Sequence, residues 1–167
     1  MQRIYLLTTG GTIEKVYSEQ RGVVENRAAK LDRYLSMLRL PDAEIHTVQL
    51  MNKDSLEMTE TDRVEVRDRI AQLLAEPAPI VISHGTDTMV ETGRFLEESF
   101  PELKVPIVLT GAMTPLGFEG SDGLQNLTES LLAARLVSPG VYIVFHGQVF
   151  PVSHVRKDKD KATFVWA

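Results

Sequence analysis

The sequence predicts an α/β protein with a doubly wound, mainly parallel sheet and helices on both of its faces. Short continuous apolar runs recur along the chain, and stretches with apolar residues at helical spacing separate them. Parallel strands covered on both faces give such runs, and right-handed crossover helices connect them. A length of 167 residues suits one domain. We therefore expect a single domain over residues 1–167 and no second domain.

The first half of the chain contains two strand and helix units. A buried strand is predicted at Ile4 to Leu7, closed by the turn residues Gly10 and Gly11. A second strand is predicted at Ile45 to Leu50. Two helical faces follow these strands: Leu31, Tyr34, Leu35 and Leu38, ended by Pro41, and Val66, Ile70, Leu73 and Leu74, opened by a capping box of Thr59 and Asp62.

The same alternation continues in the second half. Strands are predicted at Pro79 to Ser83, Val105 to Leu109 and Val141 to Phe145. The helix after the first of these is expected to begin at a cap formed by Thr88 with Glu91 and to end near Pro101, and the next helix presents Leu124, Leu127, Leu131 and Leu132 before Pro139 and Gly140. In such a sheet, ligands bind at the carboxyl ends of the strands.

Two segments do not follow the alternation. Glu14 to Asn26 is polar and has no sustained period, so it is either a surface loop or a mobile lid over the first strand end, and we favour the lid. The tail from Val149 returns to strand character only at Ala162 to Trp166. The apolar segment Val141 to Phe150 and Trp166 suggest a contact between copies of the chain, and hence a homo-oligomer.

Composition excludes several classes of function. The net charge is -5, and the basic residues from Arg156 to Lys161 alternate with Asp158 and Asp160, which argues against nucleic-acid binding. There is no apolar run of membrane-spanning length and no secretory signal pattern at the start. The chain has no cysteine, which excludes disulfides and thiolate metal sites. We expect a cytoplasmic protein without metal or cofactor.

Two glycine and threonine turns are the main chemical candidates. Thr9-Gly10-Gly11-Thr12-Ile13 places a hydroxyl at the end of the first strand. The sequence alone also allows an ordinary turn in which Thr12 bonds only to local backbone. A phosphate-binding loop is disfavoured because neither G-x-x-x-x-G-K-[ST] nor G-x-G-x-x-G occurs.

His84-Gly85-Thr86-Asp87-Thr88 repeats this design with a carboxylate beside the hydroxyl, although Asp87 or Thr88 could instead cap the following helix. His84 is not assigned to the mechanism, because a lone histidine at a strand end is more often a packed residue. Two further strand ends, Asp54-Ser55 and Thr110-Gly111-Ala112-Met113, complete a small polar pocket. Lys157, by its spacing alone, belongs to a solvated charge run.

The two turn phrases, in this order and separation, resemble the two signatures of the bacterial-type L-asparaginase family. Thr110-Gly111-Ala112-Met113, Ser121-Asp122-Gly123 and Asn126-Leu127 also match that family. The resemblance implies the fold of the family's N-terminal domain and hydrolysis of asparagine to aspartate and ammonia. It implies that Thr12 is the nucleophile, with Tyr17 assisting, and that Thr86, Asp87 and Lys157 form a second catalytic group.

The resemblance also implies a binding site for L-asparagine. Ser55 holds the α-carboxylate, Asp87 pairs with the ammonium, and Gly11, Asp54, Thr86 and Ala112 line the pocket. Family members usually continue into a smaller second domain that helps to bind the ammonium, and we expect no such domain here. Two alternatives therefore stay open: a catalytically silent module that binds asparagine or aspartate, and a glutaminase or an amidase associated with a tRNA-dependent amidotransferase.

Overall fold

The protein is described by a computed structural model that covers residues 1–27 and 31–167. Its centre is a six-stranded sheet of order β4-β1-β5-β6-β7-β8, in which every neighbouring pair is parallel except the antiparallel pair β7 and β8. The strands of this sheet are β1 (Gln2–Gly10), β4 (Ala43–Lys53), β5 (Ile80–Ser83), β6 (Pro106–Thr110), β7 (Gly140–Phe145) and β8 (Gln148–Pro151). The predicted doubly wound, mainly parallel fold is confirmed.

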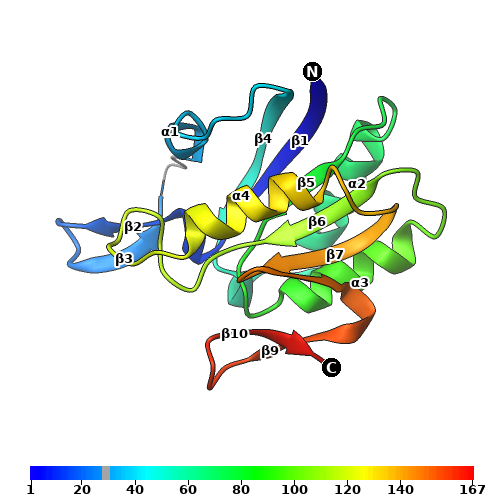
Figure 1. Ribbon diagram of the computed structural model, residues 1–167. Coiled ribbons are helices and arrows are strands. Elements are labelled where there is room, and N and C mark those ends of the chain that lie inside the picture. Colours follow the sequence, from blue (N-terminus) through cyan, green and yellow to red (C-terminus); the bar gives the residue numbers. More distant parts are fainter. Residues whose placement is uncertain (28–30) are drawn as a thin grey trace.

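Helices cover both faces of the sheet (Figure 1). The helices are α1 (Leu31–Leu35), α2 (Glu60–Leu73), α3 (Met89–Ser99) and α4 (Gly123–Ala133). Side chains of α2 and α3 pack on one face of the strands, and side chains of α1 and α4 pack on the other. Alternate strand residues feed the two cores, so that Ile80 and Ile82 face α2 and α3 while Val81 faces α4. This two-sided burial is why the central strands contain continuous apolar runs.

Three short 3₁₀ helices and two small hairpins complete the described chain. The 3₁₀ helices are η1 (Thr12–Glu14), η2 (Ser55–Glu57) and η3 (Val152–His154). The hairpins are formed by β2 (Lys15–Ser18) with β3 (Val23–Asn26), and by β9 (Val155–Asp158) with β10 (Thr163–Trp166). Both hairpins lie outside the central sheet, and β2–β3 projects from the body of the molecule (Figure 1).

Several details differ from the sequence-based expectations. Glu14 ends η1, and residues 15–26 form the β2–β3 hairpin rather than an irregular loop. The tail contains β8 and β9 in addition to the expected last strand. The capping box of Thr59 and Asp62 is confirmed. Thr88 does occupy the N-cap position before α3, but its side chain makes no capping bond, because its hydroxyl donates to the Ser55 carbonyl at 3.0 Å.

Most apolar side chains in the segment expected to contact another copy of the chain are buried within the protein. Within Val141 to Phe150, the side chains of Phe145 and Phe150 are fully buried in the core. Trp166 remains 57% exposed and packs edge-on against Phe150, with ring centroids 5.0 Å apart. Leu132 of α4 is also exposed rather than part of the buried helix face.

Across the described residues, the helices are too short or too polar to span a bilayer.

Candidate active site

The first glycine turn lets two strand ends approach each other at backbone distance. Gly11 has a φ of 80°, a left-handed conformation that glycine adopts readily. A Cβ atom on Gly11 would overlap the backbone of Gly85, which follows β5. The N–H of Gly11 also donates to the carbonyl of Lys53 at 2.8 Å. These contacts bring the ends of β1, β4 and β5 together, as the sequence predicts for one edge of a parallel sheet.

Thr12 follows this turn and begins η1, with a partly exposed side chain. Among the described residues, its hydroxyl has no side-chain hydrogen bond. Tyr17, the expected assistant of Thr12, lies on β2 in the projecting hairpin and is 57% exposed. The structure therefore leaves these two predicted residues without a direct hydrogen bond between them.

The second predicted group is assembled in full. Thr86 and Asp87 follow β5, while Lys157 comes from β9, and the Lys157 ammonium donates to the Thr86 hydroxyl at 2.7 Å and to Asp87 Oδ1 at 2.8 Å. The Thr86 residue is 6% exposed, and the Lys157 side chain is 17% exposed. Lys157 is therefore part of a shielded hydrogen-bonded group and not of a solvated charge run.

Asp54 and Ser55 lie at the end of β4, directly beside this group. The pKa of Asp54 is lowered, first by the hydrogen bond from Lys15 and then by the Leu56 N–H, and the charge of Lys157 acts in the same direction. Ser55 is 2% exposed, and its hydroxyl has no hydrogen-bond partner within residues 1–27 and 31–167. A buried polar group of this kind costs free energy unless a ligand or water satisfies it.

Glu14 is a buried acid that sequence analysis did not single out. The residue is 4% exposed and lies in η1, and its carboxyl accepts a hydrogen bond from the Ser83 hydroxyl at 3.3 Å. Burial raises the pKa of Glu14 to about 7, against the opposing effects of the Gly10 backbone and the Ser83 hydroxyl. One carboxyl oxygen has no partner among the described residues. A single glutamate after a turn gives no sequence signal for such an environment.

His84 is a packed residue of the core, the environment for which it was left out of the predicted mechanism. Burial lowers the pKa of His84 to about 4, outweighing the hydrogen bond to the Gly85 carbonyl. Its Nε2 atom lies 2.8 Å from the Thr92 hydroxyl, so the ring is a neutral part of the core. Ala112, the remaining predicted pocket residue, is 1% exposed and follows β6, where the adjacent Gly111 packs against the His84 carbonyl.

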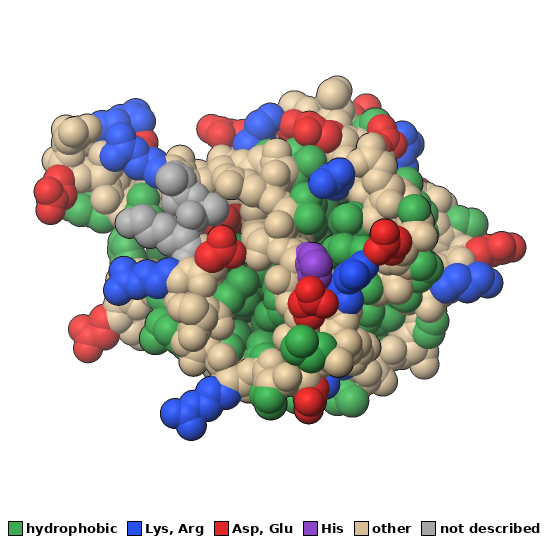
Figure 2. Space-filling model, turned by 90° about the horizontal axis from the view of Figure 1, so that it is seen from above, with side chains coloured by type: hydrophobic (Ala, Val, Ile, Leu, Met, Phe, Trp, Pro, Cys, Tyr) green, Lys and Arg blue, Asp and Glu red, His purple; other side chains and the backbone are tan. Residues whose placement is uncertain are grey.

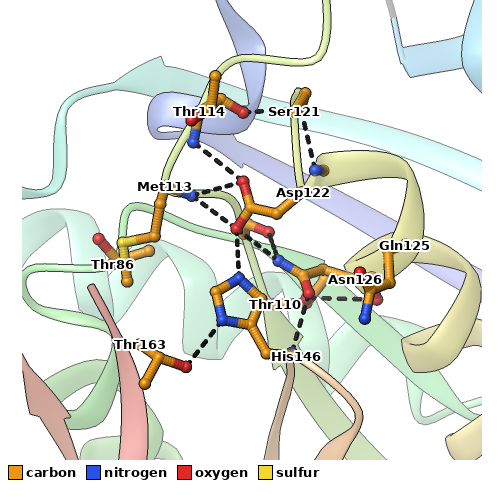
Figure 3. Close-up of polar contacts among 12 residues, drawn as sticks. Thr86, Thr110, Met113, Thr114, Ser121, Asp122, Gln125, Asn126, His146 and Thr163 are labelled. Atoms are coloured by element: carbon orange, nitrogen blue, oxygen red, sulfur yellow. Dashed lines mark hydrogen bonds and ion pairs between the residues drawn. The ribbon is translucent and has the colours of Figure 1, made fainter. Parts of the chain in front are cut away.

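Figure 3 shows a second polar network, also absent from the sequence-based site. It joins Asp122 at the start of α4 to His146 after β7 and to Thr163 on β10. Elsewhere, positive and negative side chains are interspersed on the face shown in Figure 2. In the described part of the chain, no three His, Asp or Glu side chains are close enough to hold a metal ion.

Comparisons with known proteins place these features in context. The model of a family described as "Asparaginase, N-terminal" matches residues 3–164. The chain is 31% identical over 155 residues to an L-asparaginase of Thermococcus kodakarensis, covering 93% of this chain and 47% of that protein. It is 34% identical over 161 residues to L-asparaginase 1 of Escherichia coli, covering 92% and 47%.

A third relative carries the name of a different enzyme. The chain is 32% identical over 151 residues to a glutamyl-tRNA(Gln) amidotransferase component of Methanococcus vannielii, covering 89% of this chain and 35% of that one. The solved structure of the Thermococcus kodakarensis L-asparaginase superposes with a TM-score of 0.86 at 30% identity, covering 99% of this chain and 51% of that structure. The chain thus spans about half the length of the two L-asparaginases.

Proposed function

Because this chain belongs to the asparaginase family, we propose that it is an L-asparaginase that hydrolyses L-asparagine to L-aspartate and ammonia. The cluster of Lys157, Thr86 and Asp87 carries this proposal. Lys157 reaches Thr86 and Asp87 across 71 and 70 residues of sequence. A lysine held on a threonine hydroxyl beside a carboxylate is suited to moving a proton to or from that hydroxyl.

In the proposed mechanism, the Thr12 hydroxyl oxygen attacks the side-chain amide carbon of asparagine, and Tyr17 assists the hydroxyl. The proton of Thr12 passes through the relay groups to the departing amide nitrogen. The negative charge that develops on the amide oxygen requires donors, and backbone N–H groups of the glycine turns are suited to this role. Collapse of the tetrahedral intermediate breaks the C–N bond. The amide nitrogen accepts a proton and leaves as ammonia. Water then attacks the resulting ester, which restores Thr12 and releases aspartate. Thr86, Asp87 and Lys157 relay the protons of these steps.

The proposed substrate position uses the unpartnered hydroxyl of Ser55. This buried hydroxyl is a donor for the α-carboxylate, and the Asp87 carboxylate pairs with the ammonium. Gly11, Asp54 and Ala112 close the pocket around the substrate. Burial of Ser55 supports the assignment, because a bound carboxylate would satisfy a hydroxyl that has no other partner among the described residues.

The direct test is ammonia release by purified chain 1–167 from asparagine and from glutamine, measured with a coupled assay. Thr12→Ala and Thr86→Val are each expected to abolish release while circular dichroism shows an intact fold. Near-normal turnover by Thr12→Ala would overturn the assignment of the nucleophile. Binding of asparagine in a calorimeter without ammonia release would favour the catalytically silent binding module.

A second candidate function is the release of ammonia from another amide, as in a glutaminase or an amidotransferase-associated amidase. The similarity to the glutamyl-tRNA(Gln) amidotransferase component favours keeping this candidate. Faster turnover of glutamine than of asparagine in the same assay would select it. Cytoplasmic location and homo-oligomer formation remain parts of the proposal, and size-exclusion chromatography with light scattering tests the second.

A further inference from the structure

A continuous chain of hydrogen bonds links Asp122, His146 and Thr163 (Figure 3). Asp122 Oδ2 lies 2.7 Å from His146 Nε2, and His146 Nδ1 lies 2.8 Å from the Thr163 hydroxyl oxygen. With a carboxylate at Nε2, that nitrogen carries the proton and donates it, and in the neutral ring Nδ1 accepts from Thr163. The His146 and Asp122 side chains are 29% and 16% exposed, so these hydrogen bonds are largely shielded from water.

The Asp122 end of this chain is firmly anchored. The N–H groups of Met113 and Thr114 donate to its carboxylate at 3.0 and 2.9 Å, and the Asn126 amide donates at 3.1 Å. Burial acts to raise the pKa of Asp122, but these backbone donors and His146 outweigh it and lower the pKa. Asp122 thus fixes Met113 and Thr114, which directly follow the predicted pocket residue Ala112.

His146 occupies a left-handed backbone conformation that is uncommon for residues other than glycine. It and Gly147 connect β7 to β8 with φ angles of 47° and 77°. Two-residue hairpin turns with positive φ at both positions favour Asn-Gly or Gly-Gly. A side chain kept in such a conformation points to a role that its contacts fulfil. Here the imidazole bridges Asp122 and Thr163.

Thr163, at the other end of this hydrogen-bond series, lies on the strand that pairs with the strand of Lys157. Thr163 is followed on β10 by Phe164, which pairs with Lys157 across the β9–β10 hairpin. Phe164 packs edge-on against Phe145, the neighbour of His146, with ring centroids 5.0 Å apart. Phe145 and His146 therefore contact Phe164 and Thr163 of β10, respectively. β10 pairs with β9, the strand that carries Lys157.

We propose that His146 is a positioning residue that fixes the β9–β10 hairpin through Thr163 and so holds the Lys157 ammonium on Thr86. This inference rests on the proposed function for its effect on turnover, but not for its effect on Lys157. Val155 anchors the base of the hairpin in the core, and Phe164 anchors the rung opposite Lys157. The hydrogen bond to Thr163 fixes the next rung toward the turn. Loss of the bridge moves Lys157 without unfolding the hairpin.

The test uses substitutions that separate turn stability from the bridge. His146→Asn suits the turn conformation but is too short to bridge both partners. Thr163→Val keeps the shape and strand preference but removes the hydroxyl, and Thr163→Ser restores the hydroxyl. His154→Asn is the matched control, because His154 is exposed on η3 and its ring bonds only to Ser153 among the described residues.

We expect His146→Asn and Thr163→Val to lower kcat for asparagine about 10- to 100-fold. KM is expected to change by less than about twofold, as for a group that acts after binding. The melting temperature of His146→Asn should equal or exceed that of the wild type. Thr163→Ser should recover most of the turnover, and His154→Asn should behave as the wild type. Wild-type kcat in both His146→Asn and Thr163→Val would overturn the proposal.

A second readout is independent of catalysis. A lysine ammonium held by two acceptors exchanges its protons slowly enough to be seen by ¹H–¹⁵N NMR, so the Lys157 signal should be present in the wild type and in Thr163→Ser. It should broaden or vanish in His146→Asn and Thr163→Val. If the wild type releases no ammonia, the proposed function fails, and this signal alone decides the inference. An unchanged Lys157 signal in all variants would overturn it.

Discussion

Glu14→Gln tests whether one buried carboxyl group governs how the stability of this protein depends on pH. Burial raises the pKa of Glu14 from its ordinary value of 4.5 to about 7. The folded protein therefore binds this proton more tightly than the unfolded chain does. The stabilisation is fully present below pH 4.5 and is lost as the pH rises through about 7.

The size of the effect follows from the two pKa values. Each tenfold difference in proton affinity corresponds to about 1.36 kcal/mol, so the change from 4.5 to about 7 is worth about 3 kcal/mol. That is a large share of the roughly 5–15 kcal/mol that stabilises a typical domain. Glutamine is neutral at every pH and removes this dependence. Groups that titrate identically in both proteins cancel in the difference.

Urea unfolding of the wild type and of Glu14→Gln between about pH 5 and pH 8.5 measures this difference. The free energy of unfolding of the variant, relative to the wild type, should increase by about 2.5 kcal/mol across this interval, because the remainder is already lost below pH 5. A constant offset caused by the new amide does not affect the result. The same substitution at Glu97, which is exposed on α3, is the control and should give parallel curves. Parallel curves for Glu14→Gln would refute the reasoning.

Three further substitutions test the site and the fold. Ser55→Ala should raise KM for asparagine about tenfold with little loss of stability, because its hydroxyl has no partner in the described chain; an unchanged KM in steady-state assays would exclude it from binding. Lys157→Met should lower kcat at least about 100-fold in ammonia assays, and a small loss would exclude a proton-transfer role. Thr59→Ala should cost about 1 kcal/mol in urea unfolding by removing the capping box, with kcat unchanged; equal stability would contradict this.

The central strands and their burial could be predicted because each contains a continuous apolar run. The edges could not be predicted equally well. β4 extends over Ala43–Lys53, beyond the predicted Ile45 to Leu50, since an edge strand keeps exposed polar residues in its ladder. β8 gave too weak a signal because it is short and ends at Pro151, and its turn uses His146 where Asn would have indicated a hairpin.

The candidate site shows the same division. The ends of β1 and β5 carry local signatures, so Thr12, Thr86 and Asp87 could be found from sequence. Lys157 could be assigned only by resemblance, because its partners are about 70 residues away and its neighbours are charged. The contact of Thr88 with the Ser55 carbonyl was unpredictable for a related reason: a tertiary acceptor replaced the local helix cap.

The β2–β3 hairpin, which projects from the body of the molecule, makes the candidate site easier to disrupt than the fold. A two-stranded hairpin is marginally stable in isolation, and such segments open at lower free energy than the core. Tyr17 lies on one hairpin and Lys157 on the other. Mild heat or denaturant would then open the β2–β3 hairpin and displace Tyr17 from the candidate site. The six-stranded sheet would persist, and so would the β9–β10 hairpin, which Val155 and Phe164 anchor in the core. Inactivation would precede global unfolding, and refolding of a strand pair, rather than of the domain, would restore function.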